Sequence, residues 1–171
     1  STKGGITFAA STTQNGIHMI TVALGVEAVD GDPYARFVAT SSLMNYVVRT
    51  FVSSIVVKEG DPYGKSKATI MDGKSETVLA VAKKDFYIVE KQGSQAEPKI
   101  QFKSDQESFR APVKSGTNLG KLHYTDPDKI GRGYLEDQEP TVDMVSGRTI
   151  EKSFFLKVWW NEFVRYVNEK L

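Results

Sequence analysis

The two histidines, His18 and His123, are the residues that could bind a transition metal. Each lies in a segment predicted to be a β-strand, and neither has a second ligand at metal-binding spacing. A metal site needs about three or four converging ligands. The absence of cysteine excludes disulfides, thiolate metal sites and cysteine nucleophiles. We therefore expect two ordinary strand histidines, no metal site and no cofactor.

The segment Lys114-Ser115-Gly116-Thr117 has the order of a catalytic Lys-Ser/Thr-Gly triplet. In hydrolases that use this triplet, it lies on a strand beside a serine-lysine pair. Here it stands between Pro112 and Gly120, and Ser-Gly is typical of a turn. We interpret the segment as a turn within a β-rich region.

Two acidic clusters, at residues 126–128 and 136–139, carry oxygens that could bind calcium. Their spacing does not match a calcium-binding loop, so solvated loop charges are the simpler interpretation. The glycine-containing segments 116–120 and 131–133 lack the strand-to-helix context of a phosphate-binding loop.

The composition is that of an ordinary globular protein. The 171 residues are 40% hydrophobic and 25% charged, and the net charge is +1. Such a small charge gives no reason to expect a nucleic acid or another polyanion as partner. There is no apolar run of about 18 residues and no signal peptide. Ser1 to Gly5 run almost directly into an apolar segment, and so abrupt a start is typical of a fragment.

Four kinds of element must position any functional residues. Residues 6–12 and 17–26 are apolar and β-prone, and Asn15-Gly16 between them predicts a tight β-hairpin. Asp32 suits a helix N-cap and Pro33 the first helical position, and apolar residues at helical spacing continue to about Phe51.

From Ile55 to about Val145 the chain consists of short apolar segments between turn signals, which predicts an all-β sandwich or open barrel. The segments are 68–70, 77–82, 86–90, 99–102, 111–113, 120–124 and 141–145.

The terminal segment, residues 149–171, contains neither glycine nor proline, and its polar residues recur at helical spacing. We predict an amphipathic helix with a wide apolar face rich in aromatic residues. Those aromatic residues are Phe154, Phe155, Trp159, Trp160, Phe163 and Tyr166. Trp and Tyr favour a membrane interface, and Lys157 and Arg165 on the polar face fit that location. The alternative is a core helix packed on the β domain.

Three stretches together carry a resemblance to a known family. The hairpin followed by PYARFVATSSLMNY (residues 33–46) resembles the end of the transpeptidase domain of low-molecular-mass penicillin-binding proteins, which are serine D-alanyl-D-alanine carboxypeptidases. The stretch APVKSGTNLGKL (residues 111–122) resembles a strand-turn-strand of that family's β-rich second domain. Residues 154–171 resemble the C-terminal anchor helix of streptococcal members.

The resemblance implies a catalytic mechanism whose key motifs this chain lacks. The family uses Ser-x-x-Lys, Ser-x-Asn and Lys-Thr-Gly, in which the first serine is the nucleophile. No serine here has Lys three residues later or Asn two residues later. We therefore expect no catalytic residue in this chain, with the catalytic machinery immediately upstream of Ser1. By resemblance, Arg36 would help to hold the substrate's terminal carboxylate; the alternative is a surface arginine paired with Asp30 or Asp32.

The expected architecture is mixed. Residues 1–54 would be a β-hairpin and helix from the end of a transpeptidase domain of β-lactamase-like α/β type. Residues 55–148 would be the β-rich second domain, and residues 149–171 the membrane-surface helix. The parent would trim peptidoglycan pentapeptide stems and bind β-lactams through its N-terminal part, at the extracytoplasmic face of a bacterial membrane. The alternative is a non-catalytic cell-surface binding module.

Overall fold

The computed structural model describes residues 6–27, 32, 34–94, 98–126, 138–154, 159–160 and 163–167. The chain forms two compact units. The first comprises Ser1–Ser54 and Ile88–Gln95, and the second comprises Ile55–Tyr87 and Ala96–Leu171. The division into functional domains at residues 54 and 148 remains a prediction, because compactness alone does not separate functions.

The first unit contains the predicted hairpin. Strands β1 (Ile6–Gln14) and β2 (Ile17–Val26) pair antiparallel, and Gln14 lies opposite Ile17. Asn15 and Gly16 both have positive φ, at 52° and 75°. Two central residues of positive φ define a type I′ turn, so the Asn-Gly prediction is confirmed.

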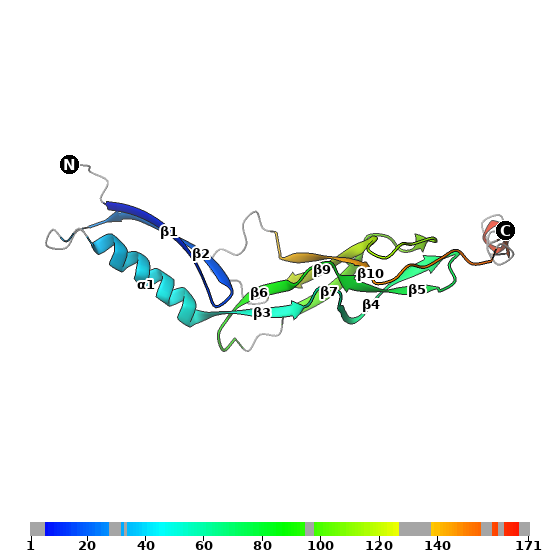
Figure 1. Ribbon diagram of the computed structural model, residues 1–171, viewed down its shortest axis with the longest axis horizontal. Coiled ribbons are helices and arrows are strands. Elements are labelled where there is room, and N and C mark those ends of the chain that lie inside the picture. Colours follow the sequence, from blue (N-terminus) through cyan, green and yellow to red (C-terminus); the bar gives the residue numbers. More distant parts are fainter. Residues whose placement is uncertain are drawn as a thin grey trace. The chain divides into compact units, whose positions relative to one another are not determined.

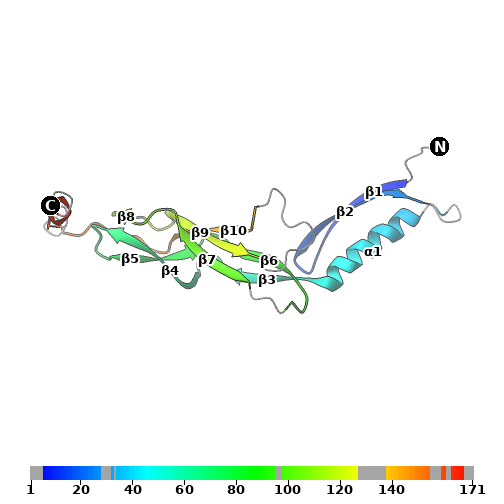
Figure 2. The same ribbon diagram turned by 180° about the vertical axis from the view of Figure 1, so that it is seen from behind.

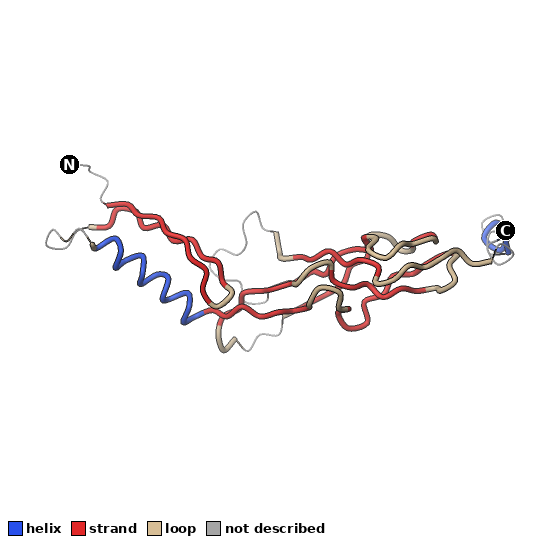
Figure 3. The backbone as a smooth tube through the Cα atoms, in the orientation of Figure 1, coloured by secondary structure: helices blue, strands red, loops and turns tan. Residues whose placement is uncertain are grey.

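Helix α1 (Ala35–Thr50) covers one face of the hairpin (Figure 3). Alternate residues of β2, among them Ile17 and Met19, are buried, whereas Ile20, Val22 and Leu24 on the other face are exposed. The rings of Phe8 and Phe37 meet edge to face, with centroids 4.9 Å apart. The hairpin thus has one packed face and one apolar face that is open in this structure.

The start of α1 differs from the prediction. The helix begins at Ala35, and its N-cap residue is Tyr34 rather than Asp32. Asp32 still binds a free amide at this end, because its Oδ1 accepts the hydrogen bond of Tyr34 N at 2.8 Å. The Asp32 carboxylate therefore binds the amide of the N-cap residue itself rather than an amide of the first helical turn, and Pro33 lies outside the described residues.

Strand β3 (Phe51–Val57) was not predicted. It follows α1 without a loop, because Phe51 is both the helix C-cap, at φ −123° and ψ 150°, and the first strand residue (Figure 3). It pairs with β6 (Phe86–Lys91) in a two-stranded sheet. The sequence analysis ended the helix at about Phe51, as observed, but no turn residue marks the change from helix to strand there.

A six-stranded sheet makes up most of the second unit, in the order β7-β9-β10-β5-β4-β8 (Figures 1 and 2). Its antiparallel strands are β4 (Pro62–Met71), β5 (Thr77–Ala82), β7 (Lys99–Ser104), β9 (Asn118–Thr125) and β10 (Thr141–Ser146). The short β8 (Phe109–Arg110) pairs parallel with the end of β4. The mostly β character predicted for this region is confirmed.

The predicted strand at Ala111–Val113 is wrong. The strand lies earlier, at β8, and Val113 makes only an isolated bridge to Ile150. Pro112 has no backbone N–H and therefore cannot continue a ladder. Ala111 and Val113 are nevertheless buried, which explains the apolar signal.

The core of the second unit consists of inward-facing residues of its central strands. Leu122, Met144 and Ala80 are fully buried, one from each of β9, β10 and β5. Burying one large apolar side chain is worth about 1.5–3 kcal/mol, so burial of these residues stabilises the sheet. At Gly120, φ is 150° and an added Cβ would lie 2.1 Å from the carbonyl oxygen of Lys103, so only glycine fits between the two strands.

The terminal segment is not one helix from residue 149. Thr149–Phe154 is non-helical: Ile150 bridges to Val113, and Lys152 to Gly73. Helix is described at residues 159–160 and 163–167. The apolar Ile150 is buried against the sheet, and this tertiary pairing outweighs its helical spacing. Within the described residues, no helix has the length and apolar character that crossing a bilayer requires.

Candidate functional site

A buried carboxylate marks the place where the terminal helix meets the sheet. Asp72 follows the last residue of β4 with φ 59°, a left-handed conformation that aspartate tolerates better than most residues. Its side chain is only 4% exposed. Next to it, Gly73 has no room for a Cβ, which would lie 2.9 Å from the Cγ2 atoms of Ile70 and Ile150. Tight packing thus fixes the turn that carries the carboxylate.

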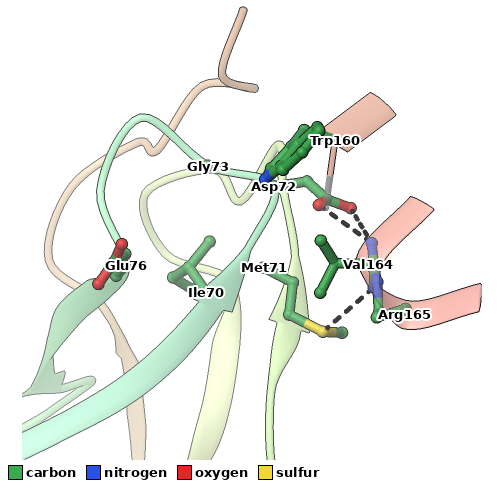
Figure 4. A pocket seen from close by; sticks show the side chains of 8 residues that line it. All are labelled: Ile70, Met71, Asp72, Gly73, Glu76, Trp160, Val164 and Arg165. Carbon is green, nitrogen blue, oxygen red and sulfur yellow. Dashed lines mark hydrogen bonds and ion pairs between the residues drawn. The ribbon is translucent and has the colours of Figure 1, made fainter. Parts of the chain in front are cut away.

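Two arginines from different elements bind this carboxylate, of which Figure 4 shows Arg165. Nη2 of Arg165, on the terminal helix, lies 3.2 Å from Asp72 Oδ1 and 3.4 Å from Oδ2. Nε of Arg110, on β8, lies 3.4 Å from Oδ2. Nη1 of Arg165 also contacts the sulfur of Met71, at 3.6 Å. A buried carboxylate needs such partners, because an unpaired charge would be expensive to bury.

A cavity of about 400 Å³ lies beside this cluster. Trp160 and Val164 of the helix line one side of it, and Ile70, Gly73 and Glu76 of the β4–β5 region line the other (Figure 4). The helix therefore touches the sheet through a few residues around Arg165.

The aromatic residues of the terminal segment are exposed. Trp159 and Trp160 are 62% and 59% exposed, and Phe154, Phe163 and Tyr166 are exposed as well. Phe163 lies between the two tryptophans, with centroids 6.1 and 6.0 Å from theirs. Phe155 lies outside the described residues. These side chains form an exposed aromatic cluster, with Trp160 at its edge also lining the cavity, and they do not fill the core of the β domain.

Arg36 lies in the first turn of α1. Its guanidinium carbon is 4.5 Å from the ring centroid of Phe37, a cation–π contact. The Asp32 carboxylate accepts the amide of Tyr34, and Asp30 lies outside the described residues. The substrate role suggested for Arg36 remains a prediction.

The other sequence candidates lie apart from this site. Ser115 is in a turn closed by the Thr117 amide, which donates to Lys114 O at 3.1 Å, so the turn interpretation is confirmed. His18 Nδ1 lies 3.0 Å from Thr13 Oγ1. Among the described residues, no group of three or more potential ligands converges as a metal site would require.

His123 has a perturbed pKa. Partial burial in β9 lowers the pKa of this imidazole, and the positive charges of Lys103 and Lys121 lower it further. Glu139 acts in the opposite direction. The neutral ring is therefore favoured at this position.

Sequence reasoning missed Asp72 as a site residue. Asp72 falls in one of the unassigned stretches between the predicted strands 68–70 and 77–82, and Arg165 was placed only on the polar face of the predicted helix. The two residues lie far apart in the chain, and nothing in their local spacing indicates that they meet.

Comparison with known proteins places this fold. The family model described as "Penicillin-binding protein 5, C-terminal domain" matches residues 51–152. The crystal structure of a peptidoglycan synthesis regulatory factor (PBP3) from Streptococcus pneumoniae matches with 41% identity and a TM-score of 0.81, over 88% of this chain and 41% of that chain.

Two further structures match at lower identity, which speaks for the fold alone. Penicillin binding protein 5 from Haemophilus influenzae is 21% identical, with a TM-score of 0.60, over 85% of this chain and 39% of that one. The D-alanyl-D-alanine carboxypeptidase DacD from Francisella tularensis is 16% identical, with a TM-score of 0.55, over 90% and 35%. The chain thus spans well under half the length of these proteins. Together the matches confirm the family resemblance that the sequence indicated.

Proposed function

Because the chain belongs to the penicillin-binding protein 5 C-terminal domain family, we propose that it is the C-terminal part of a serine-type D-alanyl-D-alanine carboxypeptidase. The parent would trim the terminal D-alanine from peptidoglycan pentapeptides: its serine would be acylated and then released by water. β-Lactams would acylate the same serine. The relationship to PBP3 of S. pneumoniae supports this proposal, since that protein is described as a peptidoglycan synthesis regulatory factor.

In this proposal residues 1–54, the larger part of the first unit, belong to the catalytic domain. The apolar outer face of β2, formed by Ile20, Val22 and Leu24, is open in this structure, and the remainder of a transpeptidase domain would cover it. Arg36 would help to hold the carboxylate of the substrate. An Arg36→Gln change in the whole enzyme should then raise KM for a D-Ala-D-Ala substrate. The melting temperature should change little.

We also propose that the chain binds the outer surface of the bacterial membrane through its terminal helix. One observation supports this role above others: the aromatic cluster is exposed, with only Trp160 at its edge also lining the cavity, while Arg165 binds Asp72 of the β domain. A helix that served only as part of the core would bury Trp159 and Trp160. Exposed tryptophans and tyrosines suit the interface, where one edge is apolar and the other can form hydrogen bonds.

Apolar burial would dominate this membrane binding. From Glu151 onward there are four basic and three acidic residues, which leaves a net charge of +1 (4 − 3). Attraction to an anionic surface is worth about 1 kcal/mol per charge. Full burial of one large apolar side chain is worth about 1.5–3 kcal/mol, and several such side chains share one side of the helix. Binding should therefore survive high salt and differ little between neutral and anionic lipid.

Vesicle cosedimentation tests the membrane role. Replacing Trp159, Trp160 and Phe163 with serine should abolish sedimentation while the melting temperature of the β domain is retained. A matched control is Tyr87→Ser, which removes another exposed aromatic ring, on β6. If the triple change unfolds the β domain and the unchanged chain does not sediment with vesicles, the membrane role is wrong.

The second candidate function is a non-catalytic cell-surface binding module. It is favoured by the absence of a Ser-x-x-Lys motif from this sequence. If the chain is such a module, it should bind isolated peptidoglycan with the same affinity as the whole parent protein. The parent should not be acylated by penicillin. Labelling the parent with fluorescent penicillin distinguishes the two functions.

A further inference from the structure

The segment that leads to the terminal helix is held by backbone hydrogen bonds to the β4–β5 turn. The amide of Lys74 donates to Glu151 O at 2.9 Å, and the amide of Ser153 donates to Asp72 O at 2.8 Å. Asp72 therefore binds the approaching segment through its carbonyl and the helix through its side chain. This turn is the point where the terminal segment is fixed to the sheet.

The carboxylate of Asp72 has one partner that belongs to the sheet and one that belongs to the helix. Arg110 comes from β8, which pairs directly with β4. Arg165 comes from the helix and binds both carboxylate oxygens. If Arg165 leaves, Arg110 still neutralises the buried charge. The sheet can therefore tolerate loss of the helix contact without an unpaired buried carboxylate.

The position of Arg165 decides which side of the helix faces outward. Its guanidinium points to Asp72 and Met71, beside Val164 and the cavity (Figure 4). The next residue, Tyr166, and Trp159 are exposed. A polar contact on the sheet side leaves the aromatic cluster uncovered, whereas apolar docking on the sheet would have buried it.

We propose that the Asp72 carboxylate is the docking acceptor that orients the terminal helix, and that Arg165 is the helix residue it holds. The pair keeps the aromatic cluster exposed and fixes the angle at which the β domain stands on a lipid surface. Arg165 is thus a positioning residue, and Trp159, Trp160 and Phe163 supply the affinity. The inference rests on the membrane role proposed above and adds the contact that sets orientation.

Arg165→Gln is the informative variant, because it leaves the pair of Asp72 and Arg110 intact. Amide hydrogen exchange at residues 163–167 in the lipid-free chain should become about tenfold faster or more, as a charged hydrogen-bonded pair is lost. Arg165→Lys should restore part of the protection, since lysine keeps the charge without the planar fork of arginine. Arg148→Gln is a matched control, because it removes an exposed arginine of the same unit that contacts Ser75 instead.

Orientation is measured on vesicles. The chain has no cysteine, so Glu59→Cys provides a single labelling site next to the start of β4. Pro62 lies opposite Val81 and Thr69 opposite Thr77, so at about 3.3 Å per residue the label and Asp72 lie at opposite ends of the β4–β5 pair, roughly 20 Å apart. Energy transfer from the label to lipid dyes should be low in the otherwise unchanged chain. It should rise in Arg165→Gln, because the freed β domain tilts toward the surface, while the fraction bound stays the same.

Two negative results have different meanings. Absence of vesicle binding by the unchanged chain contradicts the membrane role itself. Vesicle binding together with equal exchange rates and equal energy transfer in the unchanged chain, Arg165→Gln and Arg148→Gln overturns the docking proposal alone. A melting temperature that is unchanged in Arg165→Gln excludes unfolding as the cause of faster exchange.

Discussion

Ile150 and Val113 exchange both of their backbone hydrogen bonds, at 2.7 Å from Ile150 N and 2.9 Å from Val113 N. The Ile150 side chain is 4% exposed, and its Cγ2 lies over Gly73. This one residue therefore joins the terminal segment to the β4–β5 turn and to the segment after β8. The pairing makes the terminal segment part of the β domain before the helix begins.

Truncating this side chain should destabilise the β domain. Ile150→Ala removes a buried aliphatic group and leaves a cavity, for which a loss of about 2–5 kcal/mol is typical. Urea unfolding followed by circular dichroism measures the change. Leu79→Ala is the control, since Leu79 is 45% exposed on the same sheet, and its cost should be clearly smaller. Equal costs for the two changes would mean that Ile150 does not hold the terminal segment.

His123 should make stability depend on pH. Folding lowers the pKa of this imidazole below its ordinary value of 6.5. At pH values between the folded-state and unfolded-state pKa, the folded state therefore binds fewer protons than the unfolded chain. The contribution of the neutral His123 ring to the free energy of unfolding is present in full above about pH 6.5. It is lost as the pH falls from there through the lower folded-state pKa. Melting temperatures between pH 7.5 and about 5 should therefore decline, and His123→Gln should flatten that part of the profile. A His18→Gln chain, in which His123 is intact, should keep the decline; an identical profile in all three chains would refute the assignment.

The hairpin should be less stable than the sheet of the second unit. It has only two strands and one helix, and its outer apolar face is exposed. Hydrogen exchange should be fast in Ile6–Val26 and slow in β5, β9 and β10. Strong protection of the hairpin in a chain proven to be monomeric would contradict this expectation, whereas protection that appears only on self-association would support it.

This chain alone should not react with penicillin. Acylation requires an activated serine, and none of the serines has the Ser-x-x-Lys context. Incubation with fluorescent penicillin, followed by denaturing electrophoresis, should leave the chain unlabelled and label the whole parent. If the chain is labelled and Ser115→Ala abolishes the label, the turn at Lys114-Ser115-Gly116 is catalytic after all.

Local chemistry accounts for the parts of the fold that the sequence predicted. Asn15-Gly16 specifies its turn through backbone conformation alone. The alternation of Thr77–Ala82 matches β5 at both ends, because one face of that strand is buried and turn residues bound it. Such features depend on neighbours in the chain, and a single sequence contains them.

The elements that were missed depend on distant partners. Residues 51–57 form a strand because the distant β6 pairs with them, and Ile150, which lies within the predicted terminal helix, pairs instead with Val113. The contact between Asp72 and Arg165 joins two polar residues whose local sequence predicts only exposure. Tertiary contacts decided all three cases, and helical or strand periodicity does not contain them.

The chain passes between its two units three times, after Ser54, after Tyr87 and after Gln95. A gene fusion that began at residue 55 would therefore carry β6 but omit the first four residues of β3, its pairing partner. A junction between Thr50 and Phe51, in contrast, keeps β3 and β6 on the same side. The stretch that could be inherited as one piece therefore begins where helix α1 passes into β3, and not at the boundary between the two compact units.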